Sequence, residues 1–257
     1  MNTADLFMLN SKSSVESIFS QEFLINLALL FSCYAYILLI ILISGRTEGV
    51  LGFTRKSSRK FLHIMVGNLP FVIPFFSLNY FPMNFPFFVA APFILVTFLV
   101  SPYSPLKRMS MKFRGLSGIT EEGHQLGLVF YAVSYTILAV FFSAKPYVIA
   151  AGILPMAYGD ASASLVGEKY GKHRYRLFAR KSFEGSIAMF SVSFLAVAAS
   201  MFFFSIFYSF TAVSFVLVTF VVASVAAVAE GISPLGFDNV TVPILCALTF
   251  LWLSRGI

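Results

Sequence analysis

Charge is scarce in this sequence. Only 11% of the 257 residues are charged, whereas 58% are hydrophobic, and the mean hydropathy is +0.86. A soluble domain carries about 25% charged residues, so this composition is typical of a membrane protein. Cysteine is nearly absent as well. Cys33 and Cys246 both lie inside apolar runs, so we expect neither a disulfide nor thiol chemistry, and three histidines complete no zinc pattern.

The charges that are present are mostly basic and leave a net charge of +7. A soluble nucleic-acid binder would not carry this much apolar surface, and no nucleic-acid motif is found, so we expect no nucleic-acid partner. In a membrane protein a basic balance reflects anionic lipid headgroups and the positive-inside rule. Anionic phosphate substrates are the functional alternative, and the two explanations are compatible.

Apolar segments recur along the chain at about the length that crosses a bilayer, roughly 20 helical residues. They lie at about 23–43, 61–79, 84–100, 126–142, 147–166, 185–206, 209–229 and 240–254. We therefore predict an all-α polytopic membrane helix bundle of about eight transmembrane helices. One integral-membrane catalytic domain, 23–257, follows an extracytoplasmic N-terminal segment, 1–22. The third span is short and contains Pro86 and Pro92, and the last is a candidate re-entrant segment, so seven spans is the alternative.

Basic residues predict the orientation. With eight spans, most of the 18 Lys and Arg residues fall in three loops, 44–60, 101–125 and 167–184, on one side of the membrane. Only Lys12, Lys145 and Arg255 fall on the other side. The positive-inside rule then places the three loops in the cytoplasm and both termini outside, in the plasma membrane if the source is prokaryotic.

Three acids lie within or at the ends of predicted spans: Asp160, Glu230 and Asp238. Burying an Asp at the centre of a membrane helix costs roughly 2.5–3.5 kcal/mol, so each is a functional candidate. Asp160 is surrounded by small residues that let a ligand or another helix approach. The structural alternative is a packing face whose acid pairs with a neighbouring Arg.

Two basic segments have the chemistry of a phosphate site. Gly167 and Gly171 precede Lys172 at a helix end, and although this is no Walker A motif, backbone N–H groups there can bind phosphate. The segment Arg180-Lys181-Ser182-Phe183-Glu184-Gly185 opens the sixth span and suits a triphosphate. Its alternative is a cytoplasmic anchor with a helix cap made by Ser182 and Glu184.

Further polar groups lie at the same predicted membrane face. Asp238-Asn239 offers two hard oxygen ligands, to which Glu230 can add a third, and this favours Mg²⁺ over an ordinary polar turn. Arg59, Lys60 and His63 lie near one another at a helix start and suit a phosphate or substrate. A weaker cluster, Glu121, Glu122 and His124, is interpreted as a solvated loop. Carboxylates, cations and a glycine-bearing helix end together are the parts of phosphoryl transfer.

In their order and spacing these segments resemble the CTP-dependent polyprenol kinase family, which includes dolichol kinase, phytol kinase and their archaeal and bacterial relatives. The matching pieces run from about residue 55 to 245: Arg59-Lys60 with His63, Gly159-Asp160-Ala161 through Gly167 and Gly171, Lys181-Ser182 with Glu184-Gly185, and Glu230 with Asp238-Asn239 and Pro243. The resemblance implies a CTP-binding role for residues 181–185 and acidic residues that work with Mg²⁺. The Gly-His-Gly-Gly and Asp-Arg signature of the related phosphatidate cytidylyltransferases is absent.

We therefore expect a kinase that moves the γ-phosphate of CTP to the hydroxyl of an isoprenoid alcohol of the dolichol, phytol or geranylgeraniol type, with a homodimer as a possible assembly. The catalytic candidates are Asp160, Lys181 and Asp238. The nucleotide-binding candidates are Arg59, Lys60, His63, Gly167, Gly171, Lys172, Arg180, Lys181, Ser182, Glu184 and Gly185. The metal candidates are Asp160, Glu230, Asp238 and Asn239. The alternatives are a cytidylyltransferase acting on a phosphorylated lipid and, with least support, a transporter.

Overall fold

The computed structural model describes residues 21–50, 55–80, 82–101, 103, 105, 126–210, 212–234 and 236–254. In these residues the chain is helical apart from two small hairpins and the turns that connect the elements. The α-helices are α2 (Gln21–Val50), α3 (Arg55–Val66), α4 (Phe85–Val100), α7 (Gly127–Phe142), α8 (Pro146–Leu154), α9 (Asp160–Tyr170), α10 (Phe183–Phe204), α11 (Ala212–Ile232) and α12 (Asp238–Leu253). A 3₁₀ segment, η1 (Leu69–Phe75), and a π segment, η2 (Pro155–Gly159), join them. The hairpins pair β1 (Asn79–Tyr80) with β2 (Met83–Asn84) and β3 (Arg174–Arg176) with β4 (Arg180–Ser182), both antiparallel.

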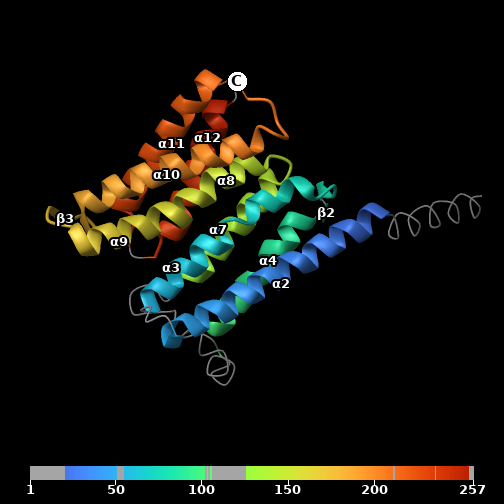
Figure 1. The fold of residues 1–257 in the computed structure, drawn as a ribbon, viewed down its shortest axis with the longest axis horizontal. Coiled ribbons are helices and arrows are strands. Elements are labelled where there is room, and N and C mark those ends of the chain that lie inside the picture. The colour runs from blue at the N-terminus through green and yellow to red at the C-terminus, as the bar shows by residue number, and fades with distance from the viewer. Residues whose placement is uncertain are drawn as a thin grey trace, which may run out of the picture.

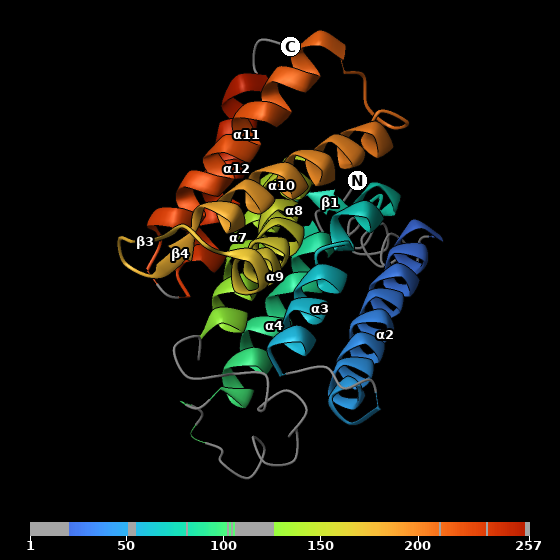
Figure 2. The ribbon, with the colours of Figure 1, turned by 60° about the vertical axis from the view of Figure 1, so that its left-hand side comes forward.

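The helix α8 lies at the centre of the bundle. Figures 1 and 2 show α10, α11 and α12 on one side of it and α2, α3 and α4 on the other. Contacts with α7, α10 and α12 enclose it, and Val148, Ile149, Ala150 and Ala151 have no exposed surface. A helix that is apolar all round is expected in this position, because every face must pack.

Length and composition make four helical stretches long and apolar enough to cross a membrane: Gln21–Ser44, Pro146–Tyr170, Phe183–Phe204 and Phe215–Ile232. Three apolar helices in the described part of the chain are shorter: Phe85–Leu99, Gly127–Phe142 and Asp238–Leu253. The prediction of an all-α polytopic membrane protein therefore holds, whereas the number of eight spans is not confirmed.

The predicted span 61–79 is wrong as a single helix. The helix α3 starts earlier, at Arg55, and ends at Val66, and the chain then turns into η1. Pro70 and Pro74 have no N–H to donate, so two prolines four residues apart weaken the α-helical hydrogen bonding of this segment. The first candidate span ends at Ser44, as predicted, but the connection 44–60 is largely helical, because α2 continues to Val50 and α3 begins at Arg55.

The predicted span 147–166 is a single path of helix that contains a π turn. Pro155 interrupts the regular ladder, and the N–H of Asp160 donates to the carbonyl of Pro155, five residues back. Such π turns are frequent at functional sites, because the extra residue redirects the side chains that follow. Here the first residue after the turn is Asp160.

Candidate active site

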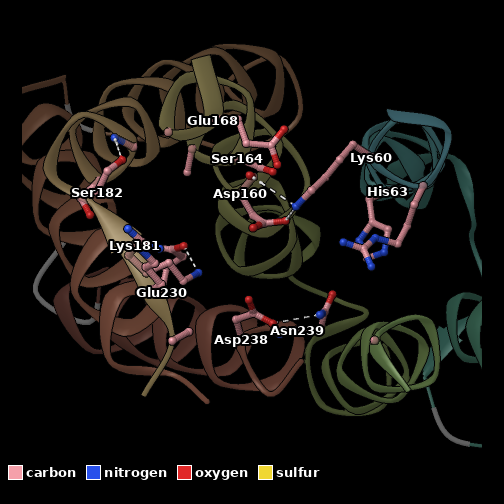
Figure 3. Close-up of a pocket in the computed structure, with 18 of the residues that line it drawn as sticks. Lys60, His63, Asp160, Ser164, Glu168, Lys181, Ser182, Glu230, Asp238 and Asn239 are labelled. Atoms are coloured by element: carbon pink, nitrogen blue, oxygen red, sulfur yellow. Dashed lines mark hydrogen bonds and ion pairs between the residues drawn. The ribbon is translucent and has the colours of Figure 1, made fainter. Parts of the chain in front are cut away.

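One polar cavity of about 480 Å³ opens inside this apolar bundle. Figure 3 shows its charged side chains converging from α3, α9, β4, α11 and α12. The lining residues are Arg59, Lys60, His63, Gly127, Asp160, Ala163, Ser164, Gly167, Glu168, Arg174, Ala179, Arg180, Lys181, Ser182, Gly185, Ser186, Glu230, Asp238 and Asn239. The volume lies in the range of small-molecule sites, roughly 300–1,000 Å³. All three catalytic candidates line it, while their roles remain predictions.

One face of α9 forms a wall of this cavity. Asp160, Ala163, Ser164, Gly167 and Glu168 all line it, at the spacing i, i+3, i+4, i+7 and i+8 that shares a helical face. Ser164 and Glu168 were not among the sequence candidates. The same spacing, counted from Asp160, was the signal that identifies them.

Asp160 forms an ion pair with Lys60 of α3, 100 residues earlier in the chain. Both residues are only 8% exposed. The expected alternative of an acid paired with a neighbouring Arg is therefore replaced by a distant Lys that itself lines the cavity. A buried carboxylate held next to a cation stays ionised, and so it can accept a hydrogen bond from a substrate hydroxyl.

A second ion pair joins Lys181 of β4 to Glu230 of α11, whose side chain is 3% exposed. Burial alone lowers the pKa of Lys181, but the carboxylates of Glu230, Asp238 and Asp160 outweigh it and raise the pKa above its ordinary value. Lys181 is therefore a stable positive charge at neutral pH. Its position among three carboxylates is the electrostatic centre of the cavity.

The third polar group is Asp238-Asn239 at the start of α12. The backbone and side-chain N–H groups of Asn239 each donate to Asp238 Oδ1 at 3.0 Å, and the side chain also donates to the carbonyl of Gly236 at 3.2 Å. These bonds fix the amide so that Asn239 Oδ1 is buried with no hydrogen-bond partner among the described residues. An unpartnered carbonyl oxygen beside a carboxylate is a pair of hard oxygen donors.

This pair of donors suits a Mg²⁺ ion that is held by few protein oxygens and not by a cluster of carboxylates. The described residues contain no preassembled group of three or more His, Cys, Asp or Glu side chains that could hold a metal. Asp160 and Glu230, two of the predicted ligands, are instead paired with lysines. Mg²⁺ commonly takes one or two protein oxygens and completes its shell with substrate phosphates and water, and Asp238 with Asn239 Oδ1 supplies that number.

Arg59 and Arg180 add positive charge to the cavity, and neither forms an ion pair within the described part of the chain. Arg59 is 8% exposed, and its Nη1 is buried with no hydrogen-bond partner among the described residues. Arg180 lines the cavity from an exposed position on β4. A guanidinium nitrogen buried without an acceptor is costly unless a ligand supplies one, and phosphate oxygens are suitable acceptors.

Three predicted nucleotide-binding residues do not reach the cavity: Gly171, Lys172 and Glu184. Lys172 is exposed, and Glu184 Oε1 instead lies 2.8 Å from His173 Nδ1, where it accepts from the hairpin. Ser182 lines the cavity but also caps α10, because its Oγ accepts from the N–H of Gly185 at 3.1 Å. The capping alternative was therefore correct for Ser182.

The glycines serve close packing. A Cβ on Gly171 would collide with the Gly167 carbonyl and with Ser182, and a Cβ on Gly185 would lie 2.9 Å from the Ala163 carbonyl. The absence of side chains therefore lets α9 and α10 meet around the cap. The predicted cluster Glu121, Glu122 and His124 lies outside the described residues.

Comparison with known proteins identifies relatives that are named phytol kinase or farnesol kinase. The chain is 43% identical to phytol kinase of Synechocystis over 143 residues, which are 51% of this chain and 58% of the relative. It is 28% identical to chloroplastic phytol kinase 1 of Arabidopsis thaliana over 214 residues, 77% of this chain and 66% of the relative. It is also 28% identical to chloroplastic farnesol kinase of the same plant over 125 residues, 48% of this chain and 41% of the relative.

These alignments cover less than two thirds of each relative. No protein-family model matches the chain, and no solved structure matches it. Over these shared segments the chain is similar to curated proteins named phytol kinase and farnesol kinase.

Proposed function

We propose that this protein is a membrane-embedded kinase that transfers the γ-phosphate of a nucleoside triphosphate, CTP by family resemblance, to the hydroxyl of an isoprenoid alcohol. The observation that carries the proposal is the polar cavity enclosed by an apolar bundle, with the pairs Lys60–Asp160 and Lys181–Glu230 beside Asp238-Asn239. Such a kinase has to bring a hydrophobic acceptor to a highly charged donor. A charged cavity surrounded by apolar helices provides a polar environment for the donor next to an apolar one for the acceptor. The names of the relatives support the same acceptor class.

The cations of the cavity bind the triphosphate. Lys181, Lys60 and Arg59 lie on its wall and neutralise charge on the phosphate oxygens. Arg59 Nη1 gains an acceptor that none of the described residues gives it. In this arrangement Lys60 is shared between the nucleotide and Asp160, so binding of the nucleotide weakens its hold on that carboxylate.

Asp160 accepts the proton of the alcohol. The alcohol oxygen attacks the γ-phosphorus, the bond from that phosphorus to the β–γ bridging oxygen breaks, and the nucleoside diphosphate leaves. The proton of the hydroxyl passes to the Asp160 carboxylate. The products are the isoprenyl monophosphate and the diphosphate, and the proton later returns to solvent.

Asp238 and Asn239 Oδ1 are the residues that hold Mg²⁺ in this proposal. The ion, when bound, neutralises charge on the phosphates during transfer. Glu230 keeps Lys181 in place rather than binding the metal directly. By the positive-inside rule we assign the cavity to the cytoplasmic face and the termini to the other side.

The test uses purified protein in lipid nanodiscs with γ-labelled CTP and phytol, farnesol, geranylgeraniol or dolichol. We expect labelled lipid monophosphate that depends on Mg²⁺. Asp160→Asn and Lys181→Ala are expected to lower kcat/KM by at least 100-fold, whereas Lys172→Ala, an exposed Lys outside the cavity, is expected to change it less than twofold. Label released as pyrophosphate would identify a cytidylyltransferase instead. Full activity of both cavity variants would disprove the assigned roles.

A further inference from the structure

A second cavity, almost wholly apolar, borders the polar one. It has a volume of about 60 Å³ and lies between α2, α3, α4 and α7, with Ile37, Leu62, Val89, Ala132 and Tyr135 among its lining residues. His63 lines both cavities. Because it shares this residue with the charged site, the apolar cavity is not an isolated packing defect.

One hydroxyl in this apolar cavity lacks a partner. Thr97 Oγ1 donates to the Phe93 carbonyl at 2.6 Å, and the Tyr131 hydroxyl donates to the His63 carbonyl at 3.3 Å. The Tyr135 hydroxyl, on a residue only 4% exposed, has no hydrogen-bond partner among the described residues. A buried unsatisfied hydroxyl costs free energy, so it marks a place where a ligand completes the bonding.

Size and exposure indicate how much of a ligand the cavity holds. At about 60 Å³ it is far smaller than the polar cavity and is too small for a whole 20-carbon chain. Val96, on its α4 side, is 39% exposed on the outer surface of the bundle. A chain that begins at His63 can therefore leave the protein past α4 and continue in the surrounding lipid.

From this geometry we infer that the apolar cavity holds the first isoprenoid unit of the acceptor, with its hydroxyl end beside His63 and Tyr135, which both line the cavity, and its tail leaving past α4. The occupant must be hydrocarbon over its length and carry an acceptor near one end, and an isoprenoid alcohol has this chemistry. The inference rests on the proposed function and adds the acceptor subsite to it. It also implies that the protein recognises the hydroxyl end of the isoprenoid alcohol and not the full length of its hydrocarbon chain.

The subsite is tested first by photolabelling. An isoprenoid alcohol with a diazirine in its first isoprene unit is added to the full-length protein in nanodiscs, without nucleotide, and labelled peptides are mapped. We expect label in α4 and α7 that excess phytol removes. Label confined to α10, α11 and α12, or label that phytol does not remove, would overturn the inference.

Matched variants then test the same site. Ala132→Phe fills the cavity and is expected to raise the KM for the alcohol at least tenfold with the KM for the nucleotide unchanged, whereas Val140→Phe, on the outer face of α7, leaves both unchanged. Tyr135→Phe removes only the hydroxyl and is expected to raise the alcohol KM roughly threefold to tenfold, the value of one hydrogen bond, without lowering the melting temperature. This milder variant decides the matter if Ala132→Phe does not fold, and an unchanged alcohol KM in it would count against the subsite.

Failure of the subsite and failure of the proposed function give different results. Competed label in α4 and α7 without phosphoryl transfer would support the alcohol site and disprove the kinase. Phosphoryl transfer with competed label on other helices would support the kinase and overturn the subsite.

Discussion

The buried pair Lys181–Glu230 gives a prediction in which stability and activity separate. Replacing one member of a buried ion pair strands the other charge, at a cost of about 3–5 kcal/mol. The side chain of Glu230 is 3% exposed and that of Lys181 is 20% exposed, so solvent can relieve part of the penalty. We therefore expect Lys181→Met to destabilise the protein by about 3 kcal/mol, about a hundredfold in the ratio of folded to unfolded protein.

The double variant Lys181→Met/Glu230→Gln removes both charges and leaves none stranded. It is expected to recover most of the lost stability, because Gln has the shape of Glu without its charge. Kinase activity is expected to stay at least 100-fold below wild type in both variants, since neither has the cation that binds phosphate.

The assay combines equilibrium unfolding in mixed detergent micelles with initial rates of phytol phosphorylation. Lys172→Met, on the exposed segment beside the same hairpin, is the control and should match wild type in both measurements. Wild-type stability of Lys181→Met would refute the account of the buried pair. Wild-type activity of the double variant would refute the phosphate role of Lys181 whatever its stability.

Three further predictions concern other parts of the site. Gly171→Ala should destabilise the protein by about 1–3 kcal/mol in thermal unfolding, because the new Cβ would collide with backbone and with Ser182. Gly236→Ala should cost only about 1 kcal/mol, because φ is +85° there but no atom lies within 4 Å of the new Cβ. The reverse order would contradict the packing role of Gly171. Asn239→Ala should raise the Mg²⁺ concentration for half-maximal activity at least tenfold, measured by metal titration, and an unchanged titration would remove Asn239 from the metal site. Glu184→Gln should change the KM for CTP less than twofold, since Glu184 bonds His173 outside the cavity, and a large increase would return it to the nucleotide site.

The convergence of the site could be predicted because buried charge is expensive in a membrane protein. Asp160, Lys181 and Asp238 are far apart in sequence, yet each needs a polar environment, and an apolar bundle offers few of them. Which lysine pairs with which acid could not be predicted from the sequence. Whether Lys60 would meet Asp160 or a phosphate depends on the crossing of α3 and α9, which no local pattern encodes.

The differences between the predictions and the structure have local causes. Segment 61–79 has a composition that favours a span, and the hydropathy of its apolar residues outweighed the proline signal of Pro70 and Pro74. The resemblance implies a nucleotide role for Glu184, whereas its contact with His173 outside the cavity depends on the path of the hairpin, which the local sequence does not reveal. Ser164 and Glu168 belong to no linear motif, and only their helical spacing from Asp160 brings them to the cavity.

The balance of charge in the cavity indicates that Mg²⁺ and the nucleotide bind together. Asp160 and Glu230 are each held by a lysine, whereas Arg59 and Arg180 form no ion pair within the described residues. Among the described residues, cations are ready for phosphate, and Asp238 with Asn239 Oδ1 gives a metal two oxygens, which are few for Mg²⁺. We expect the ion to bind weakly alone and tightly as its complex with the nucleotide, whose phosphates complete its shell. Isothermal titration of Mg²⁺ with and without a non-hydrolysable CTP analogue measures this coupling, and equally tight metal binding in the absence of nucleotide would show that the protein builds the metal site by itself.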